Sequence, residues 1–264
     1  MNPMTTAATT AAGGGPHGVS TARLRPYLLR AKYECVQMLR QPSFAIPTLV
    51  FPTMFYLFFG VLFAREGVST YLLATYGTFG IMGPALFGFG VGVALERESG
   101  SLRLERVTPM PPMAYLGAKV SMSLLFGALV IVELFLIGAW LGDVRLERAQ
   151  WFGLAGVLVL SILPFAAIGL ALGVRLKGQG APAVINLIYL PMSILSGLWI
   201  PIMLFPDVMK TLALALPPYH VAQLALGVLD MDEGQGAPFH LGVLAAYTAV
   251  CLALAIRGFR NLED

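Results

Sequence analysis

The stretch Leu116–Leu141 reads LGAKVSMSLLFGALVIVELFLIGAWL, and it decides the class of fold. Beyond Lys119 it contains a single charged residue, Glu133. A helix of about 20 mostly apolar residues is long enough to cross the roughly 30 Å hydrocarbon core of a bilayer. The stretch therefore predicts a transmembrane helix.

Five further stretches share this length and apolar character. They run over about Phe44–Ala64, Tyr71–Leu95, Trp151–Val174, Ala181–Phe205 and Phe239–Ile256. Taken together, the six stretches predict an all-α membrane protein with six transmembrane helices.

The composition agrees with this class. Of the 264 residues, 57% are hydrophobic and 12% are charged, whereas soluble domains carry roughly 25% charged residues. The mean hydropathy of +0.77 points the same way. The net charge of +3 gives no indication of a nucleic-acid partner, so none is expected.

The basic residues are strongly asymmetric about the predicted spans. Of the 17 Lys and Arg residues, 12 precede the first span, follow the sixth, or lie in the loops after the second and fourth, and Lys119 at the start of the third span makes 13 on the same side. Cytoplasmic segments carry such an excess of positive charge. The pattern predicts that both termini are cytoplasmic.

Two segments outside the spans have their own character. Residues 1–20 are rich in Ala, Thr and Gly and lack an apolar run, so we expect a disordered tail rather than a signal peptide. Residues 21–40 place apolar and basic side chains on different helical faces. This pattern favours an amphipathic helix in the inner membrane interface over a simple basic flank.

The segment Asp207–Asp230 is apolar enough to suggest a seventh span. It contains Lys210 and the pair Pro217-Pro218, which a lipid-exposed helix accommodates poorly. A seventh span would also place the C-terminal arginines outside. The segment therefore predicts two short re-entrant helices that enter from the outer face before the last span.

The loop Glu96–Pro112 reads ERESGSLRLERVTPMPP and is the only sizeable cytoplasmic loop of the predicted topology. Its alternating acids and bases are typical of a solvated surface loop, although a short helix can follow Gly100. A partner protein below the membrane would contact this loop or the N-terminal helix.

Two parts of the chain resemble motifs of the ABC-2 type permease family. Glu96–Leu102, Val107–Pro109 and Leu116–Lys119 resemble the cytoplasmic pattern E-x-E-x-G-T-L-x(5)-T/S-P followed by L-G-K. Ser101 replaces the usual Thr, and Ala118 is inserted into L-G-K. These departures leave the subfamily open.

The second part is a weaker match to the pattern S-G-x-x-x-P…P…P-x-x-y. It consists of LSGLWIP over Leu195–Pro201, then Phe205-Pro206, then LPPY over Leu216–Tyr219. The resemblance covers most of the chain, so residues 21–264 are expected to form one ABC-2 type transmembrane domain.

The resemblance implies a coupling helix around Glu98–Val107 that contacts an ATPase subunit. It also implies two ATPase subunits and a second copy of this permease in a bacterial inner membrane. The chain has no G-x-x-x-x-G-K-[ST] loop, so ATP and Mg are expected on the partner, with no catalytic site, cofactor or metal here. The residues expected to couple to the ATPase are Glu98, Gly100, Leu102, Arg103, Glu105 and Arg106.

The resulting functional prediction is the permease subunit of an ATP-driven exporter for a drug-like hydrophobic molecule or a lipid. Polysaccharides and lipid-linked glycans are the alternative substrates. An ion-coupled secondary transporter and a non-transporting scaffold are the alternatives of another class. An intramembrane hydrolase would need a nucleophile and a base, for which Ser196 and His220 or His240 are available, but no G-x-S-x-G context exists.

Several residues within the spans are candidates for the translocation path. The aromatic residues Phe51, Phe55 and Tyr56 lie in the first span, where they either line a path or face lipid. Glu133 is the only acid well inside a span, so it is a functional candidate or an interhelical hydrogen-bond partner.

Overall fold

The computed structural model describes residues 19–63, 67–102 and 112–260. Most of the predicted tail, residues 1–18, lies outside the described residues, and helix α1 begins at Val19. Every regular element in the described ranges is helical. The α-helices are α1 (Val19–Leu39), α2 (Pro42–Phe55), α3 (Val68–Leu86), α4 (Gly92–Glu98), α6 (Pro112–Trp140), α7 (Arg148–Leu160), α8 (Ile162–Gly173), α9 (Ala181–Leu195), α10 (Asp207–Ala213), α11 (Pro217–Gly227) and α12 (Ala237–Arg260).

Four short helical stretches of other pitch connect these elements. Two are π-helical, η1 (Tyr56–Leu62) after α2 and η2 (Phe87–Val91) between α3 and α4. Two are 3₁₀ turns, η3 (Gly178–Gly180) and η4 (Ile202–Leu204). The π-helical stretches follow Pro52 and Pro84, which lack the amide hydrogen that a regular α-helix needs.

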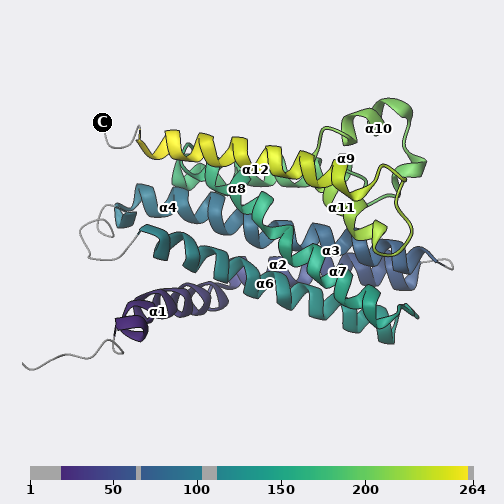
Figure 1. Ribbon diagram of the computed structural model, residues 1–264, viewed down its shortest axis with the longest axis horizontal. Helices are drawn as coiled ribbons and strands as arrows, with labels where there is room; N and C mark the ends of the chain where they lie inside the picture. Colours follow the sequence, from purple (N-terminus) through teal and green to yellow (C-terminus); the bar gives the residue numbers. More distant parts are fainter. Residues whose placement is uncertain (1–18, 64–66, 103–111, 261–264) are drawn as a thin grey trace, which may run out of the picture.

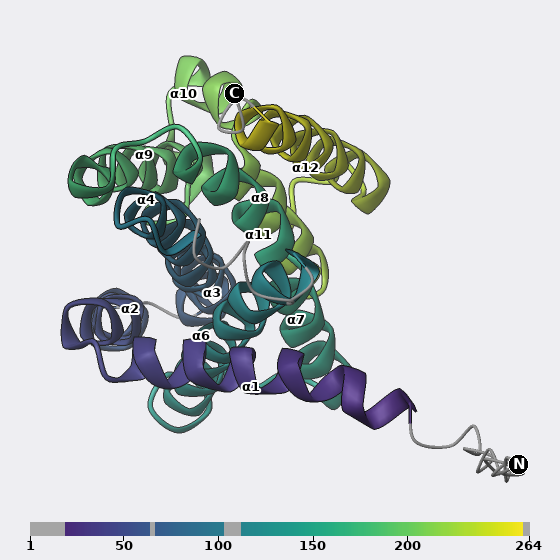
Figure 2. The ribbon, with the colours of Figure 1, turned by 90° about the vertical axis from the view of Figure 1, so that its left-hand side faces the viewer.

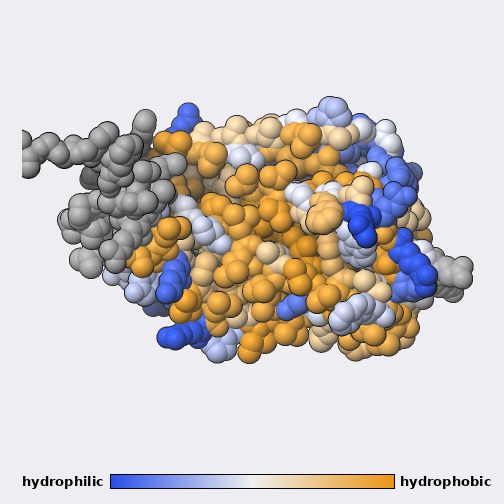
Figure 3. All heavy atoms as spheres, turned by 60° about the horizontal axis from the view of Figure 1, so that its bottom comes forward, coloured by the Kyte–Doolittle hydropathy of each residue, from blue (hydrophilic) through white to orange (hydrophobic). Residues whose placement is uncertain are grey.

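The long helices run side by side and form a bundle with two distinct ends (Figure 1). At one end, here the α1 end, lie α1, the end of α4, the start of α6 and the end of α12. At the other, here the α10 end, lie α10 and α11. On the face shown in Figure 3, apolar residues form a band across the middle and hydrophilic residues gather toward both ends.

Within the described residues, five helical segments are long and apolar enough to cross a membrane. They are Pro42–Leu62, Val68–Glu98, Ala114–Trp140, Arg148–Gly173 and Ala237–Phe259. Each agrees with one of the predicted spans to within a few residues. The apolar band and these helices indicate a multi-pass membrane protein.

The structure does not confirm the predicted fifth span, Ala181–Phe205, as one crossing helix. Helix α9 has 15 residues, or about 22 Å of helix at 1.5 Å per residue, which is shorter than the hydrocarbon core. Gly197 ends it with a positive φ of 76°. The amide of Gly197 bonds Ile194 O and that of Leu198 bonds Ser193 O, the hydrogen-bond pair of a Schellman motif.

Helix α3 is the centre of the bundle, and nearly all of its residues are buried. It packs against α2, α6, α8 and α11. Helix α8 approaches the next part of this span closely. A Cβ atom added at Gly173 would lie 2.7 Å from Phe89 O, so only glycine allows the two backbones to meet there.

Helix α1 lies across the α1 end of the bundle rather than along it (Figure 2) and packs on α6. This orientation is compatible with an interfacial helix, and its place in the inner membrane interface remains a prediction. The segment Asp207–Asp230 forms the two short helices α10 and α11, separated at Leu214–Leu216 before the prolines. Two helices there were predicted; their entry from the outer face remains a prediction.

Candidate functional site

Lys119 of α6 is fully buried at the α1 end, and its ammonium joins two carboxylates from other helices. Lys119 Nζ lies 2.9 Å from Glu34 Oε1 of α1 and 2.9 Å from Glu96 Oε1 of α4. Glu34 is also buried. One side chain therefore ties α1, α4 and α6 together where the sequence predicts the cytoplasmic face.

Two further side chains complete the surroundings of Lys119. The hydroxyl of Tyr115 donates to Glu96 Oε2 at 2.6 Å, and Arg30 Nη2 lies 3.6 Å from Glu34 Oε2. Among the contacts described, the cluster pairs the two cations Lys119 and Arg30 with the two carboxylates of Glu34 and Glu96. This balance matters because a buried charge without a partner is strongly destabilising.

Arg97, which follows Glu96 in α4, connects α4 to the end of α8. Its guanidinium donates to Val174 O and, at 2.6 Å, to Leu176 O. These carbonyls lie just beyond the last turn of α8, where no intrahelical donor remains for them. A cation there also interacts favourably with the negative end of the helix dipole.

Glu98 connects α4 to the turn that precedes α9. Its Oε2 accepts from the amide of Gln179 at 3.0 Å. A Cβ atom at Gly178 would lie 2.3 Å from that same oxygen, so the glycine makes room for the carboxylate. The consecutive residues Glu96, Arg97 and Glu98 therefore bond three different parts of the bundle. We call these three residues, together with Glu34 and Lys119, the α4 junction.

The structure describes only half of the residues predicted to couple to an ATPase. Glu98 belongs to the α4 junction, and Leu102 is half-buried against the main core. Gly100 has a φ of +77°, a conformation that L side chains rarely adopt, and it turns the chain out of α4. Arg103, Glu105 and Arg106, with most of the expected coupling helix, lie outside the described residues.

Sequence reasoning did not assign roles to Glu34, Glu96, Arg97 or Lys119. A usable signal existed for Lys119, because a lysine one turn inside a long apolar helix needs a buried carboxylate. Glu34 is harder to find, since it lies 85 residues away on a helix whose polar face was expected to meet water.

A groove of about 450 Å³ runs between α2 and α9, which flank α3 and α4 (Figure 2). Its walls are mostly apolar, and Gln41, Ser43, Thr48 and Asn186 are the polar exceptions apart from Tyr189. The exposed faces of α2 and α9 beside it carry large apolar side chains, among them Val50 and Leu187.

An aromatic cluster lies between α2, α3 and the end of α9, and Tyr189 joins it to the groove. The ring centroids of Phe55 and Trp199 are 4.5 Å apart, and those of Phe79 and Tyr189 are 4.9 Å apart. The indole nitrogen of Trp199 and the hydroxyl of Tyr76 are buried without a hydrogen-bond partner among the described residues. Buried polar atoms of this kind can bond a water molecule or a polar group of a ligand.

The structure does not gather the four predicted path residues in one place. Phe51 lines the groove, and Phe55 belongs to the aromatic cluster. Tyr56 is instead buried, with its hydroxyl 2.9 Å from Ser69 Oγ. Glu133 Oε2 accepts from Thr53 Oγ1 at 3.0 Å, the interhelical hydrogen bond that was one of its two interpretations.

The described residues hold no nucleophile–base pair at Ser196. Its hydroxyl is buried without a hydrogen-bond partner there. His220 and His240 face each other instead, with their Nδ1 atoms 2.9 Å apart. The hydrolase alternative therefore gains no support from the geometry.

Comparison with known proteins gives the same class as the fold. The chain is similar to the candidate transport permease YvfS of Bacillus subtilis (strain 168), with 29% identity over 231 residues. The similarity covers 84% of this chain and 92% of that protein. A family model described as ABC-2 type transporter matches residues 27–229, which include α2 to α11, the groove and the α4 junction. The chain therefore belongs to the ABC-2 type transporter family.

Proposed function

We propose that the chain is the membrane-spanning permease of an ATP-driven exporter in a bacterial inner membrane. Two copies would form the membrane part, and two separate ATPase subunits would bind ATP and Mg on the cytoplasmic side. The family supports a transport permease; the direction, the partners and the substrate are our proposal.

The excess of Lys and Arg supports an orientation with the α1 end in the cytoplasm. In that orientation an even number of crossings is needed, because the chain enters from α1 and α12 ends at the same side (Figure 1). We assign the sixth crossing to α9 together with Leu198–Phe205, an irregular segment that includes the turn η4 and buries Leu198, Ile202 and Phe205. Such backbone is tolerated at membrane depth where protein buries it.

The α4 junction is the observation that carries the proposal. Glu96 bonds Lys119 of α6, which in turn bonds Glu34 of α1. Arg97 bonds the end of α8, and Glu98 bonds the turn before α9. These three consecutive residues of α4 immediately precede the loop in which an ATPase would dock. A force on that loop would reach four parts of the bundle through one rigid helical turn, which is what coupling between two states of the assembly requires.

The substrate and the path follow from the groove between α2 and α9. The exposed apolar faces that flank it suit a second copy of the chain, so the paired grooves would form the path. The predominantly apolar walls favour a hydrophobic small molecule or a lipid over a glycan, which would need more hydroxyl and amide groups along its route.

The test is purification of the tagged chain from its native membrane under gentle conditions. We expect a stoichiometric ATPase with a phosphate-loop sequence, and loss of that subunit when Gly100–Leu102 are replaced. The complex in liposomes should hydrolyse ATP and export a lipophilic dye rather than a lipid-linked glycan.

Recovery of the chain without any ATPase would contradict the exporter and favour a scaffold or a secondary transporter. Dye transport that follows an ion gradient and ignores ATP would favour the secondary transporter. Glycan export by the complex would keep the ATP-driven permease and overturn the proposed substrate class.

A further inference from the structure

A second cavity opens on the surface of the bundle, away from the groove. It has a volume of about 890 Å³ and lies between α7, α8, α11 and α12. None of its lining residues belongs to the groove between α2 and α9. Leu160, Leu163 and Leu241 line it and are 69%, 48% and 57% exposed, so it opens toward the surface that a bilayer would cover.

The long dimension of the cavity matches one leaflet. Along α12 its wall runs from His240 to Leu252, a distance of about 18 Å at 1.5 Å per residue. One leaflet contributes roughly half of the 30 Å hydrocarbon core. Apolar residues dominate this wall, including Leu241, Leu244 and Leu252. The cavity thus has the length and the surface that an acyl chain needs.

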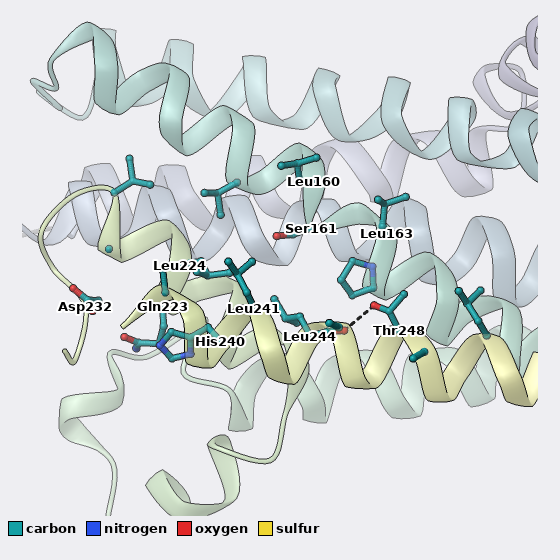
Figure 4. A pocket seen from close by; sticks show the side chains of 18 residues that line it. Leu160, Ser161, Leu163, Gln223, Leu224, Asp232, His240, Leu241, Leu244 and Thr248 are labelled. Carbon is teal, nitrogen blue, oxygen red and sulfur yellow. Dashed lines mark hydrogen bonds between the residues drawn. The ribbon is translucent and has the colours of Figure 1, made fainter. Parts of the chain in front are cut away.

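One end of the cavity is polar. Gln223, Asp232 and His240 gather near the α10 end, while the labelled leucines extend away from them along the bundle (Figure 4). Asp232 is the only acid among the lining residues, and these include no Lys or Arg. A net anionic headgroup would meet the carboxylate of Asp232 without a compensating cation, whereas the terminal ammonium of a zwitterionic headgroup would be attracted to it.

The histidine pair adds a hydrogen-bond acceptor at this end. His220 Nε2 lies 3.0 Å from Leu214 O, which can only accept, so this nitrogen carries the proton. Burial lowers the pKa of His220, which keeps the ring neutral at pH 7. His220 Nδ1 then accepts from His240 Nδ1 at 2.9 Å. His240 Nε2 is left as a bare acceptor, buried and without a partner among the described residues.

We infer that this cavity binds a phospholipid whose headgroup carries a primary ammonium, such as phosphatidylethanolamine, from the leaflet at the α10 end. One acyl chain lies between α8 and α12. The ammonium lies beside Asp232, and its N–H groups supply the donor that His240 Nε2 lacks. The bound lipid connects the short helix α11 to α12 and is separate from the transport path.

Native mass spectrometry of the purified full chain can measure this site directly. The protein is titrated with dioleoyl phosphatidylethanolamine, phosphatidylcholine and phosphatidylglycerol, which share their acyl chains. The choline headgroup keeps the positive charge but has no N–H. We expect phosphatidylethanolamine to bind about tenfold more tightly than phosphatidylcholine, because a hydrogen bond to a charged group is worth at least that factor.

Two variants test the assignment and one controls for it. Asp232→Asn should weaken the binding of phosphatidylethanolamine and reduce its preference over phosphatidylglycerol, because the carboxylate that attracts an ammonium and repels an anionic headgroup is lost. Leu160 lines the cavity and is exposed, so the larger side chain of Leu160→Trp should fill the cavity without unfolding the protein. This variant should bind all three lipids more weakly. Asp207→Asn changes a fully exposed acid of α10, outside the cavity, and should leave the preference intact.

Equal affinities for phosphatidylethanolamine and phosphatidylcholine in the parent protein would overturn the headgroup assignment. An unchanged lipid affinity in Leu160→Trp would overturn the site itself. Loss of the preference in Asp207→Asn as well as in Asp232→Asn would show a general surface-charge effect and would also overturn it.

Discussion

Lys119 Nζ lies 2.9 Å from Glu34 Oε1, although 85 residues separate them, and both side chains are almost fully buried. The ion pair is the point where α1, which lies across the bundle, is attached to α6, which runs along it. Because Lys119 also bonds Glu96, the attachment extends to α4.

Replacing Lys119 by Met should destabilise the protein strongly. Two carboxylates would lose their shared cation, and removal of one partner from a buried ion pair costs roughly 3–5 kcal/mol. Thermal unfolding of the detergent-purified chain measures the effect. The triple variant Glu34→Gln/Glu96→Gln/Lys119→Met should recover part of the loss, since it leaves no uncompensated charge.

The matched control for this prediction is the surface pair of Arg145 and Asp143, 2.9 Å apart and more than 80% exposed on both sides. Arg145→Met should leave the unfolding temperature nearly unchanged, because exposed pairs contribute little. A Lys119→Met protein as stable as Arg145→Met would contradict the role given to the buried lysine.

Arg97→Ala should separate coupling from assembly. The guanidinium of Arg97 joins α4 to the carbonyls at the end of α8, and its loss should cut that connection while the docking loop is retained. We expect the ATPase to remain bound and ATP-driven dye export to fall sharply. ATPase co-purification and transport in liposomes measure the two separately.

Arg175→Ala is a suitable comparison for Arg97→Ala. Arg175 also caps carbonyls of this region, donating to Ala171 O at 2.7 Å and to Leu254 O at 3.0 Å, and neither of these hydrogen bonds involves α4. Both variants lose similar hydrogen bonds. If the two reduce export equally, the effect comes from a loosened helix end and the α4 junction is not the coupling element.

Gly173→Ala should weaken the packing of α8 on η2. The added Cβ would lie 2.7 Å from Phe89 O and 2.8 Å from Gly90 O, and backbone cannot move aside as a flexible side chain can. Forcing an extra carbon into a packed contact costs typically 1–3 kcal/mol. Gly156→Ala on α7 meets nothing within 4 Å and should be neutral or stabilising. Melting of both variants side by side checks the contrast.

The spans illustrate how far the sequence predicts this fold. Apolar length places five candidate crossing helices to within a few residues, because every residue of a span is kept from water, either by lipid or by neighbouring helices. The same criterion predicts too long a helix from Ala181, which ends at Leu195 in the structure. Ser196 and Gly197 lower the average hydropathy of the stretch too little to reveal the helix end. The Schellman turn at Gly197 is a local backbone property that hydropathy does not register.

The site was predicted less completely than the spans. The motif from Glu96 to Leu102 was identified as a coupling segment by resemblance, but which helix each charge would bond could not be inferred. Arg97 shows why: its partners are backbone carbonyls of Val174 and Leu176, which every residue possesses. Only the packing of α4 against α8 selects those two.

Acidification should destabilise the pair of short helices at the α10 end. Burial lowers the pKa of His220 below its usual value, with the hydrogen bond to Leu214 acting in the opposite direction. The unfolded chain, with a histidine pKa of about 6.5, then binds more protons than the folded one below that pH. Stability should therefore be full above about pH 6.5 and fall as the pH decreases through that value.

Thermal unfolding at pH 8 and pH 5 measures this dependence. His220→Gln retains an N–H donor for Leu214 O but does not titrate, so the drop in unfolding temperature between the two pH values should shrink. An unchanged drop in this variant would show that groups other than His220 dominate the response.

Glu133→Gln should leave transport intact if the protein is driven by ATP. The carboxylate accepts a hydrogen bond from Thr53 Oγ1, and a glutamine oxygen can accept the same bond, so the contact between α2 and α6 would survive. A carrier driven by protons would instead need a group that gains and loses a proton, and Glu133 is the only acid well inside a predicted span. Dye uptake by inverted vesicles, measured with ATP and with an imposed pH gradient, separates the two mechanisms.

ATP-driven uptake that is equal in the parent and the variant supports the structural role of Glu133. Uptake that needs the pH gradient and disappears in Glu133→Gln would establish the ion-coupled alternative, whatever the α4 junction does.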